Sequence, residues 1–597
     1  MTTAAIITLI IIGLAIGLFV WEKFSADLVA LLAMVALVFT GVLTPEEGIA
    51  GFANPATITV AFMFVISAAL LKTGAMQVVA LRLAAVFKTN FNLGMFLMLL
   101  LIAVTSAFIN NTPVVAVFLP VVIKIAHSSG KAASKMLIPL SYASILGGVC
   151  TLIGTSTNLL VNGMAVQRGL PAIGMFEFTL MGLVFLVAGL LYIMFAGIRV
   201  LPTRKLNESL QERYELRKYL SEIELLPESP WVGHRIMDSE LARDVGLDII
   251  EVRRGEEVFP MPPGDFVLRS YDKLKVRCDV EKLKTLKDRE RISMNTSVKL
   301  GDNDLMGAQS SLVELVVTVE SEFVNKTLKE VDFRRSFRAI PIGIRHREAL
   351  MHDHLYDVIL QPGDIILAEV KTHYVEELRK MEQHSPSPFI LLSEDKVRDF
   401  DQAGFRKVLA IVAAMVGLVS FGVLSILPAS VAAVVLLVLI GQLNMKELYQ
   451  AINWKIVFLM AGTLSFGAAM HKSGLDVVVA GGITTHVGMW GPIAVLSALY
   501  LITSLFTEIM SNTAAAALMT PIAISAALGL DVSVMPFLIA VMFAASASFM
   551  TPIGYQTNTM VYGTGHYRFA DFLRIGAPLN LLLWILATLL IPVLFPF

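Results

Sequence analysis

The chain has 597 residues, of which 56% are hydrophobic, and its formal net charge is −1. Soluble domains are about 45–50% apolar, and the excess here is collected into runs that contain no Asp, Glu, Lys or Arg. Several runs exceed the roughly 20 residues that cross a bilayer as a helix, which excludes a soluble globular protein and predicts a polytopic α-helical membrane protein. The runs cover residues 4–20, 28–43, 89–123, 136–167, 408–445, 532–565 and 575–597.

The charged residues are concentrated in the middle of the chain. Of the 95 Lys, Arg, Asp and Glu residues, 14 lie in residues 1–202, 10 in residues 408–597 and 71 between these halves. A soluble insert between two membrane halves is therefore expected, and the two cysteines, Cys150 and Cys278, indicate no disulfide framework. The expected segments are a first membrane half at 1–202, a connecting helix at 203–220, small α+β units at 221–290 and 305–385, a linker at 386–404 and a second membrane half at 405–597.

Two polar interruptions break the apolar sequence of the first half. They read "SAFINNTPVVAVFLP", from Ser106 to Pro120, and "GTSTNLLVNG", from Gly154 to Gly163. Single small or hydroxyl side chains in membrane helices usually serve close helix packing. A cluster of them indicates a broken helix, because irregular backbone at membrane depth is tolerated where it lines a cavity inside the protein.

The insert contains the same pattern of elements twice. An alternating strand, a turn followed by another strand, and a charged helix occur in residues 221–286 and again in residues 311–381. The paired strands read "GLDIIEVRR" and "RAIPIGIRH", then "YDKLKVRC" and "PGDIILAEV". Two small α+β units are therefore predicted.

The second half repeats the interruptions of the first after about 400 residues. "TEIMSNTAAAALMTP", from Thr507 to Pro521, matches the first interruption, and "GYQTNTMVYG", from Gly554 to Gly563, matches the second. "LLKTGAM" and "MHKSGLD" align with the same offset. Three matches in one order indicate an internal duplication, which is typical of secondary transporters.

The basic residues that flank the spans predict the orientation of the chain, because Lys and Arg are enriched in cytoplasmic loops. Residues 203–404 are expected in the cytoplasm and both termini outside, so that the two halves form inverted repeats. The residues concerned are Lys23, Lys72, Arg82, Lys88, Arg199, Arg204, Lys205, Arg406 and Lys407.

The predicted breaks can bind ions. A broken helix presents free N–H groups at one half-helix N-terminus, which attract anions, and free carbonyls at the other half's C-terminus, which coordinate cations. Asn, Ser and Thr side chains add donors and acceptors. None of the four breaks contains Lys or Arg, so amide dipoles and co-bound cations would have to balance a bound anion. This arrangement suits a cation-coupled anion symporter.

The paired Ser-Asn-Thr-like and Gly-x-x-x-Asn breaks resemble those of the divalent anion/sodium symporter (DASS) family, and the insert resembles two TrkA-C (RCK C-terminal) domains. The resemblance implies an elevator-type member of the ion-transporter superfamily, with re-entrant hairpins, a scaffold and a moving transport domain. It implies a homodimer in the inner or plasma membrane, with Na⁺ as the co-transported ion and no nucleic-acid partner. A nucleotide is the candidate ligand of the TrkA-C domains, which would serve regulation or dimerisation.

The resemblance also assigns site residues by motif. The first cation site would use Ser106, Asn110, Asn111 and Gly154, and the second Thr507, Met510 through its backbone, Ser511, Asn512 and Gly554. Asn158 is expected to join the ends of its broken helix, and Glu508 to cap a helix at the hairpin tip or to bind a cation. The substrate-binding set is Asn111, Thr112, Thr155, Ser156, Thr157, Asn158, Asn512, Thr513, Tyr555, Gln556, Thr557 and Asn558.

This sequence departs from the family pattern at both broken helices. The common Ser/Thr-Pro-Pro-Asn is replaced by Thr155-Ser156-Thr157-Asn158 in the first repeat and by Tyr555-Gln556-Thr557-Asn558 in the second, so both prolines are missing twice. The first hairpin also carries Asn110 where the family has a serine. These changes argue against a dicarboxylate, and the many hydroxyl and amide donors favour a compact tetrahedral oxyanion, with sulfate ahead of thiosulfate or molybdate.

Other functions stand as alternatives. A regulated potassium channel would carry a filter such as Thr-Val-Gly-Tyr-Gly, which the sequence lacks. A dicarboxylate symporter and a membrane sensor that binds the anion without moving it remain open. No nucleophile–base pair or metal cluster with recognisable spacing occurs, so an enzyme is not expected.

Overall fold

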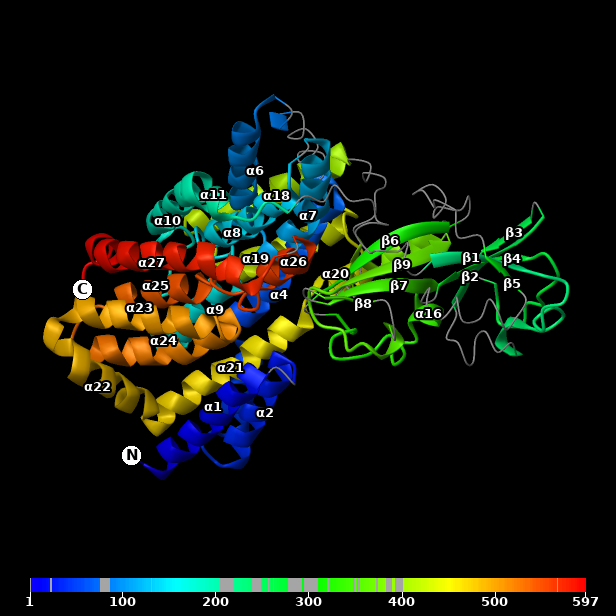
Figure 1. Cartoon of the computed structure of the whole chain (residues 1–597). Helices are drawn as coiled ribbons and strands as arrows, with labels where there is room; N and C mark the ends of the chain where they lie inside the picture. Colours follow the sequence, from blue (N-terminus) through cyan, green and yellow to red (C-terminus); the bar gives the residue numbers. More distant parts are fainter. Residues whose placement is uncertain are drawn as a thin grey trace. The chain divides into compact units, whose positions relative to one another are not determined.

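The computed structural model divides into two compact units, residues 1–204 with 396–597 and residues 205–395, and each is described by itself (Figure 1). Most of the expected connecting helix at 203–220 and the charged helix expected near residue 285 lie outside the described residues. The structure describes residues 2–21, 24–75, 86–87, 89–129, 131–204, 220–238, 248–255, 257–260, 262–277, 292–294, 310–318, 321–346, 349–351, 355–371, 374–382, 389–391, 401–565 and 567–597.

The helices of the first unit occur in two series whose bounds repeat after about 400 residues. The first series contains α1 (Thr3–Trp21), α2 (Ala26–Phe39), α3 (Pro45–Ile49), α4 (Pro55–Lys72), α6 (Phe91–Ser106), α7 (Asn111–Ser128), α8 (Leu137–Gly148), α9 (Ser156–Gln167), α10 (Thr179–Tyr192) and α11 (Ile198–Val200). The second contains α18 (Gln402–Ser420), α19 (Ile426–Leu439), α20 (Met445–Ala451), α21 (Trp454–Ser473), α22 (Leu475–Val487), α23 (Pro492–Thr507), α24 (Asn512–Gly529), α25 (Met535–Ser546), α26 (Gln556–Thr564) and α27 (Phe569–Leu594).

The prediction of a helical protein with several membrane-crossing helices is confirmed. Within the described residues, six helices are long and apolar enough to cross a membrane, and there are seven if the pair α20 and α21, bent by 53°, forms one span. Apolar helices of 10–17 residues include α6, α23 and α25. These short helices end at the predicted breaks, and α23, α24 and α25 pack side by side (Figure 1).

Two of the ion pairs that join the series have equivalent positions in them. Lys72, at the end of α4, pairs with Glu447 in α20, and Lys472, near the end of α21, pairs with Glu47 in α3, both at 2.6 Å. Each glutamate also closes a capping box at the start of its short helix. The end of α4 therefore lies beside the segment leading into α21, and the end of α21 beside the segment leading into α4. α4 and α21 thus run antiparallel.

The second unit contains two five-stranded antiparallel sheets of identical order. The first has the order β3-β2-β4-β1-β5 and the second β8-β7-β9-β6-β10. The last strand of each sheet lies beyond the ends expected at residues 290 and 385. The strands are β1 (Leu220–Leu225), β2 (Asp248–Arg254), β3 (Glu257–Pro260), β4 (Lys273–Arg277), β5 (Ile292–Met294), β6 (Ser310–Val317), β7 (Ala339–His346), β8 (Ala349–Met351), β9 (Ile365–Lys371) and β10 (Phe389–Leu391).

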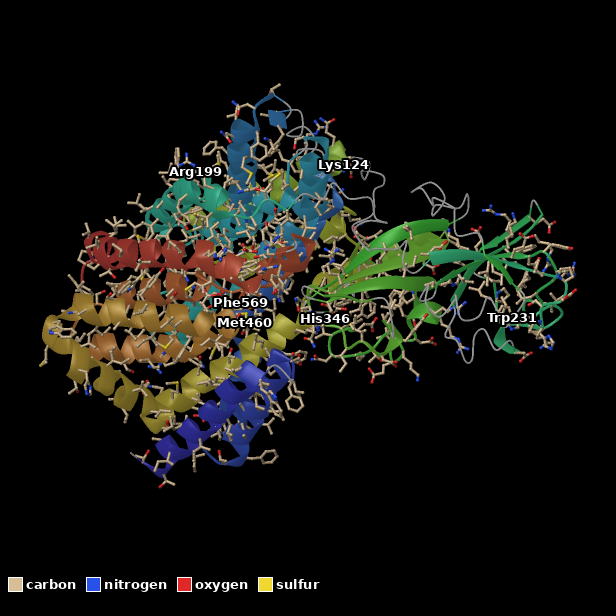
Figure 2. All side chains as sticks on the ribbon, in the orientation of Figure 1. Lys124, Arg199, Trp231, His346, Met460 and Phe569 are labelled. Carbon is tan, nitrogen blue, oxygen red and sulfur yellow. The ribbon has the colours of Figure 1, made fainter. Side chains whose placement is uncertain are left out.

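The two sheets also share a buried acid next to a basic side chain. Asp272 accepts two hydrogen bonds of 2.8 Å from the Arg254 guanidinium, and this contact raises the pKa of Arg254. In the second sheet, Asp364 lies 2.8 Å from Nδ1 of His346, which ends β7. The first sheet is packed on Trp231, which is only 3% exposed (Figure 2). In the second sheet, α17 (Val375–Glu382) lies between β9 and β10, where a charged helix is expected.

Candidate functional site

The two hairpins have the same hydrogen bond behind their tips. The predicted breaks separate α6 from α7 and α23 from α24, and the second helix of each pair begins at Asn111 or Asn512. Thr507 Oγ1 donates to Asn512 Oδ1 at 2.7 Å, and the equivalent Ser106 Oγ donates to Asn111 Oδ1. The asparagine side chains are thereby fixed at the N-termini of α7 and α24, where free backbone N–H groups favour anions.

The two broken helices are equally alike. The breaks separate α8 from α9 and α25 from α26, and the residues before the second helices, Thr155 and Tyr555, have φ/ψ of −139°/142° and −132°/137°. Asn158 Nδ2 donates across its break to the Thr151 carbonyl at 3.0 Å. Asn558 Nδ2 donates to the equivalent carbonyl, that of Thr551, at 3.1 Å. Asn158 thus joins the ends of its broken helix as expected, and its twin does the same.

Each break packs against the carbonyls of its own hairpin at a glycine. A Cβ on Gly154 would lie 2.4 Å from the Gly148 carbonyl oxygen and 3.0 Å from that of Ala107. A Cβ on Gly554 would lie 2.8 Å from the Thr507 carbonyl oxygen. No larger residue fits at either position. The two glycines therefore let oxygen atoms of a hairpin and of a broken helix gather at one place in each repeat. In the first repeat both are carbonyl oxygens, and in the second the Thr507 carbonyl meets the Ser548 hydroxyl.

Side chains of the first hairpin bond to the broken helix of the second repeat. Asn111 Nδ2 donates to Tyr555 Oη at 2.6 Å, and Thr112 Oγ1 donates to Gln556 Oε1 at 2.8 Å. The Thr155 side chain lies near Tyr555. α7 packs on α26, and α9 packs on α24. The structure therefore brings polar residues of both repeats together at the starts of α7, α9 and α26.

Two buried polar atoms next to the breaks have no hydrogen-bond partner among the described residues: Asn158 Oδ1 and Ser546 Oγ. The amide oxygen of Asn558, by contrast, accepts from Ser141 Oγ at 2.7 Å. The position equivalent to Ser141 holds Val541, so the first repeat has no donor for Asn158 Oδ1. An unpaired buried oxygen is costly, and an oxygen of this kind suits a hard cation such as Na⁺.

Glu508 lies behind the second hairpin and is buried. Its carboxylate accepts from the backbone N–H groups of Phe549, Met550 and Thr551 at 2.8–2.9 Å and from Asn580 Nδ2 at 3.0 Å. Of the two roles expected for Glu508, the helix cap at the hairpin tip is wrong, because the carboxylate binds the backbone between α25 and α26 instead. The cation-binding role stays a prediction. Glu508 fixes the second break, and Ala107 stands at the equivalent place in the first repeat.

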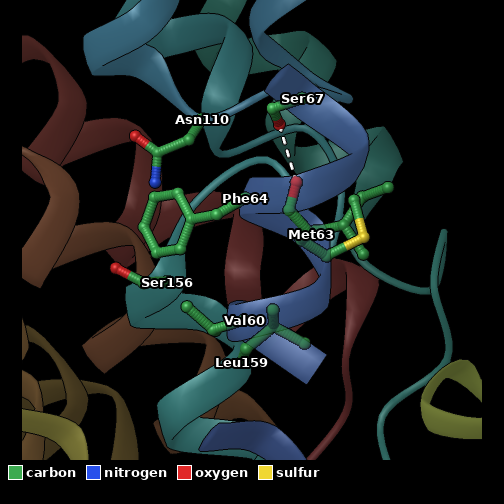
Figure 3. Close-up of a pocket in the computed structure, with 8 residues that line it drawn as sticks. Val60, Met63, Phe64, Ser67, Asn110, Ser156 and Leu159 are labelled. Carbon is green, nitrogen blue, oxygen red and sulfur yellow. Dashed lines mark hydrogen bonds between the residues drawn. The ribbon is translucent and has the colours of Figure 1, made fainter. Parts of the chain in front are cut away.

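A small cavity of about 10 Å³ lies beside the first hairpin. Asn110 and Ser156 lie on either side of the Phe64 ring, and the other lining residues belong mainly to α4 (Figure 3). This volume holds about one water molecule.

The expected site residues all lie in the first unit, at the four breaks. Thr557 Oγ1 is 2.8 Å from Ser141 Oγ, and Thr157 Oγ1 is 3.5 Å from Thr155 Oγ1. Ser511 caps α24 by accepting from the Ala514 amide at 3.3 Å, Met510 is buried behind the tip, and Thr513 follows in the first turn. The sequence interpretation missed Ser141 and Ser546. Their signal, a lone serine in an apolar helix, is too common to single them out.

Known proteins resemble this chain over most of its length. A family model described as Citrate transporter (CitMHS) matches residues 16–536. An uncharacterized transporter of Synechocystis sp. is 37% identical over 600 residues, which cover 99% of this chain and 97% of that protein. The uncharacterized transporter YfbS of Escherichia coli is 30% identical over 615 residues, which cover 98% of each. Sodium/sulfate cotransporter 1 of Chlamydomonas reinhardtii is 22% identical over 773 residues, 95% of this chain and 87% of that protein.

The match of the family model includes the insert and extends into both series of helices. These three relatives align along most of their lengths and are named as transporters or cotransporters. The expectation that the protein is not an enzyme is confirmed by these names. The chain belongs to the citrate transporter family of membrane transporters.

Proposed function

We propose that the protein is a secondary active transporter that carries a divalent oxyanion, with sulfate as the favoured substrate, together with Na⁺. The observation that carries the proposal is the meeting of both repeats at the hairpin and broken-helix N-termini, where Asn111 bonds to Tyr555 and Thr112 to Gln556. Helix N-termini attract negative charge. The side chains add hydroxyl and amide donors that can surround a tetrahedral oxyanion.

The architecture in this proposal is a pair of inverted repeats with re-entrant hairpins. The antiparallel course of α4 and α21, deduced from the two crossed ion pairs, supports it. Inverted repeats around a central site are the usual basis of alternating access. In an elevator cycle the hairpins and broken helices would move as one body against the helices that carry the crossed pairs.

Two Na⁺ sites are proposed behind the anion, one in each repeat. Oxygen atoms are the ligands of hard cations. The first site would combine Ser106, Asn110, Asn111 and the backbone at Gly154, and the second Thr507, Met510, Ser511, Asn512 and the backbone at Gly554. The unpaired Asn158 Oδ1 and Ser546 Oγ support this placement. Asn158 lies one helical turn after Gly154, and Ser546 follows Ala545, whose carbonyl accepts from Thr507 Oγ1 at 2.6 Å. We therefore assign Asn158 to the cation rather than to the anion.

The remaining residues of the anion set are proposed as direct contacts or as their supports. The direct contacts are Asn111, Thr112, Thr155, Ser156, Asn512, Thr513, Tyr555 and Gln556. Thr157, Thr557 and Asn558 support the broken helices from behind, because Thr557 and Asn558 both contact Ser141. The name of the Chlamydomonas relative, a sodium/sulfate cotransporter, agrees with this choice of substrate and ion.

A second candidate is a carboxylate symporter, which the description of the matched family as citrate transporters favours. A sulfate site has to be small, whereas a citrate or dicarboxylate site has to hold a longer anion. The cavity of about 10 Å³ beside the first hairpin holds about one water molecule and accommodates neither anion as it stands. A sensor that binds the anion without carrying it would show binding but no uptake.

The insert is proposed as two TrkA-C domains that lie in the cytoplasm, assist a homodimer and bind a small regulatory ligand, for which a nucleotide is the candidate. Two sheets of identical strand order support a duplicated domain. Deletion of residues 206–400 tests this assignment. Regulation by the insert is contradicted if the deleted protein transports at the wild-type rate and responds to nucleotides unchanged.

The main experiment is uptake of radiolabelled sulfate by purified protein in liposomes of inner-membrane lipid composition. Uptake should require an inward Na⁺ gradient, should not follow a proton gradient, and should be reduced by unlabelled thiosulfate more than by succinate or citrate. Sulfate uptake that is absent under every gradient would contradict the proposal. Citrate uptake in its place would establish the second candidate.

A further inference from the structure

The two broken helices have the same backbone but different side chains at the position that faces the hairpins. Thr155 and Tyr555 precede α9 and α26 with φ and ψ that agree within a few degrees. The next residues are Ser156 and Gln556. The first repeat therefore presents two small hydroxyl side chains where the second presents a phenol ring and a long amide.

The larger pair reaches across to the other repeat. Tyr555 Oη accepts from Asn111 Nδ2 at 2.6 Å and Gln556 Oε1 accepts from Thr112 Oγ1 at 2.8 Å. The second hairpin does not reach the first broken helix in the same way. Its Asn512 accepts from Thr507 Oγ1 of its own repeat at 2.7 Å. Among the residues that the structure describes, no hydrogen bond joins Asn512 to the side chain of Thr155. One side of the site is thus filled and the other is lined by short side chains.

The filled side restricts what can lie beside Asn111 and Thr112. Both donors are part of the proposed anion site, and both are already engaged by Tyr555 and Gln556 at hydrogen-bond distance. In this proposal a compact anion binds on the side of Thr155 and Ser156, next to the small cavity that Ser156 lines, and the ring stays in place. A longer anion, with two charged ends separated by carbon atoms, needs the space that the ring and the amide occupy.

We infer that Tyr555 and Gln556 form a size filter that admits a single tetrahedral oxyanion and excludes dicarboxylates and tricarboxylates. The inference rests on the proposed transport function. It explains how a member of a family described as citrate transporters could carry a smaller anion. The ring of Tyr555 excludes by its volume. Its hydroxyl has a separate role, because it accepts from Asn111 and holds that amide at the start of α7.

The test transfers the side chains of the first repeat to the second. The double variant Tyr555→Thr, Gln556→Ser should allow succinate to compete with labelled sulfate, with a half-inhibitory concentration lowered about tenfold or more. Tyr555→Phe keeps the ring and should still exclude succinate, while the sulfate concentration at half-maximal uptake rises about three- to tenfold. Tyr192→Phe is the matched control, since it removes a hydroxyl that donates to the Ile575 carbonyl at 2.9 Å away from the breaks.

Binding is measured separately from uptake. The melting temperature of the purified protein is recorded while the concentration of succinate or sulfate is raised in roughly 10-fold steps. Succinate should stabilise the double variant but not the wild type. This readout distinguishes failure of the filter from failure of the transport proposal, because it needs no uptake. A wild type that succinate already stabilises, or a monodisperse double variant that succinate leaves unchanged, overturns the inference. If the double variant aggregates, Tyr555→Thr alone is measured against the same expectation.

Discussion

Replacement of Glu508 by glutamine should destabilise the membrane unit strongly. The Glu508 carboxylate accepts from three backbone N–H groups, those of Phe549, Met550 and Thr551, and from Asn580 Nδ2, all within 3.0 Å. The glutamine oxygen can replace only one carboxylate oxygen. The new NH₂ group would then face the Thr551 N–H, which leaves two buried donors without acceptors.

The magnitude follows from these contacts. Each buried donor left unpaired costs about 1–3 kcal/mol, and the other hydrogen bonds lose the extra strength that a charged acceptor gives them. Removal of a buried charge recovers part of its desolvation cost. The net loss is about 3 kcal/mol, which corresponds to a fall of roughly 5 °C in melting temperature for a unit of this size. Since Glu508 fixes the backbone before Tyr555, sulfate uptake should fall as well.

The assay is scanning fluorimetry of the purified protein in detergent, followed by sulfate uptake in liposomes. Glu47→Gln is the matched control, because Glu47 makes one ion pair with Lys472 at 2.6 Å and its side chain is 41% exposed. An exposed pair of this kind contributes at most about 1 kcal/mol. Equal melting temperatures for Glu508→Gln and Glu47→Gln would refute the view that the carboxylate holds the second break.

Three further results are expected. Arg168→Ala should lower the melting temperature more than Glu47→Gln does, because it leaves the fully buried Asp476 without the arginine that lies 2.8 Å away, a loss of about 3–5 kcal/mol; an unchanged melting curve would contradict this. Arg254→Ala, which removes the partner of Asp272, should unfold the first sheet of the insert at lower denaturant concentration while sulfate uptake in the absence of nucleotide persists, as followed by proteolysis and uptake. Ser106→Ala should raise the Na⁺ concentration needed for half-maximal uptake and leave the sulfate requirement nearly unchanged; the opposite pattern would exchange the assigned roles.

The positions of the four breaks could be predicted because each places several polar residues inside an uncharged run, and because the pattern occurs twice. The structure begins α7, α9, α24 and α26 within these motifs. The bond from Asn158 to the Thr151 carbonyl could also be predicted, since both residues belong to one local motif. Local patterns thus identified the polar residues and the helix ends.

The contacts between repeats could not be predicted in the same way. Ser141 meets Asn558, which is 417 residues distant in the chain, and nothing in either segment specifies that distance. The partners of Glu508 are mainly backbone N–H groups, which every residue except proline carries. The short strands β5 and β10 were missed because three residues are too few for an alternating pattern.

The crossed ion pairs have equivalent positions in the two repeats, so an exchange of conformation between the repeats would turn each pair into the other. Lys72–Glu447 would take the place of Lys472–Glu47, and both would survive. If the inward- and outward-facing states are related by such an exchange, both pairs are present in both states. These pairs would then belong to the part of the transporter that does not move.

The bond between Asn111 and Tyr555 has no such twin, because the exchange would set Asn512 opposite Thr155, whose side chain is too short to reproduce it. The two facing states would then differ in energy even with the substrate absent. A carrier of this kind would rest on one side of the membrane, and contacts that occur in one repeat only, such as this one and the bond between Thr112 and Gln556, would set the preference.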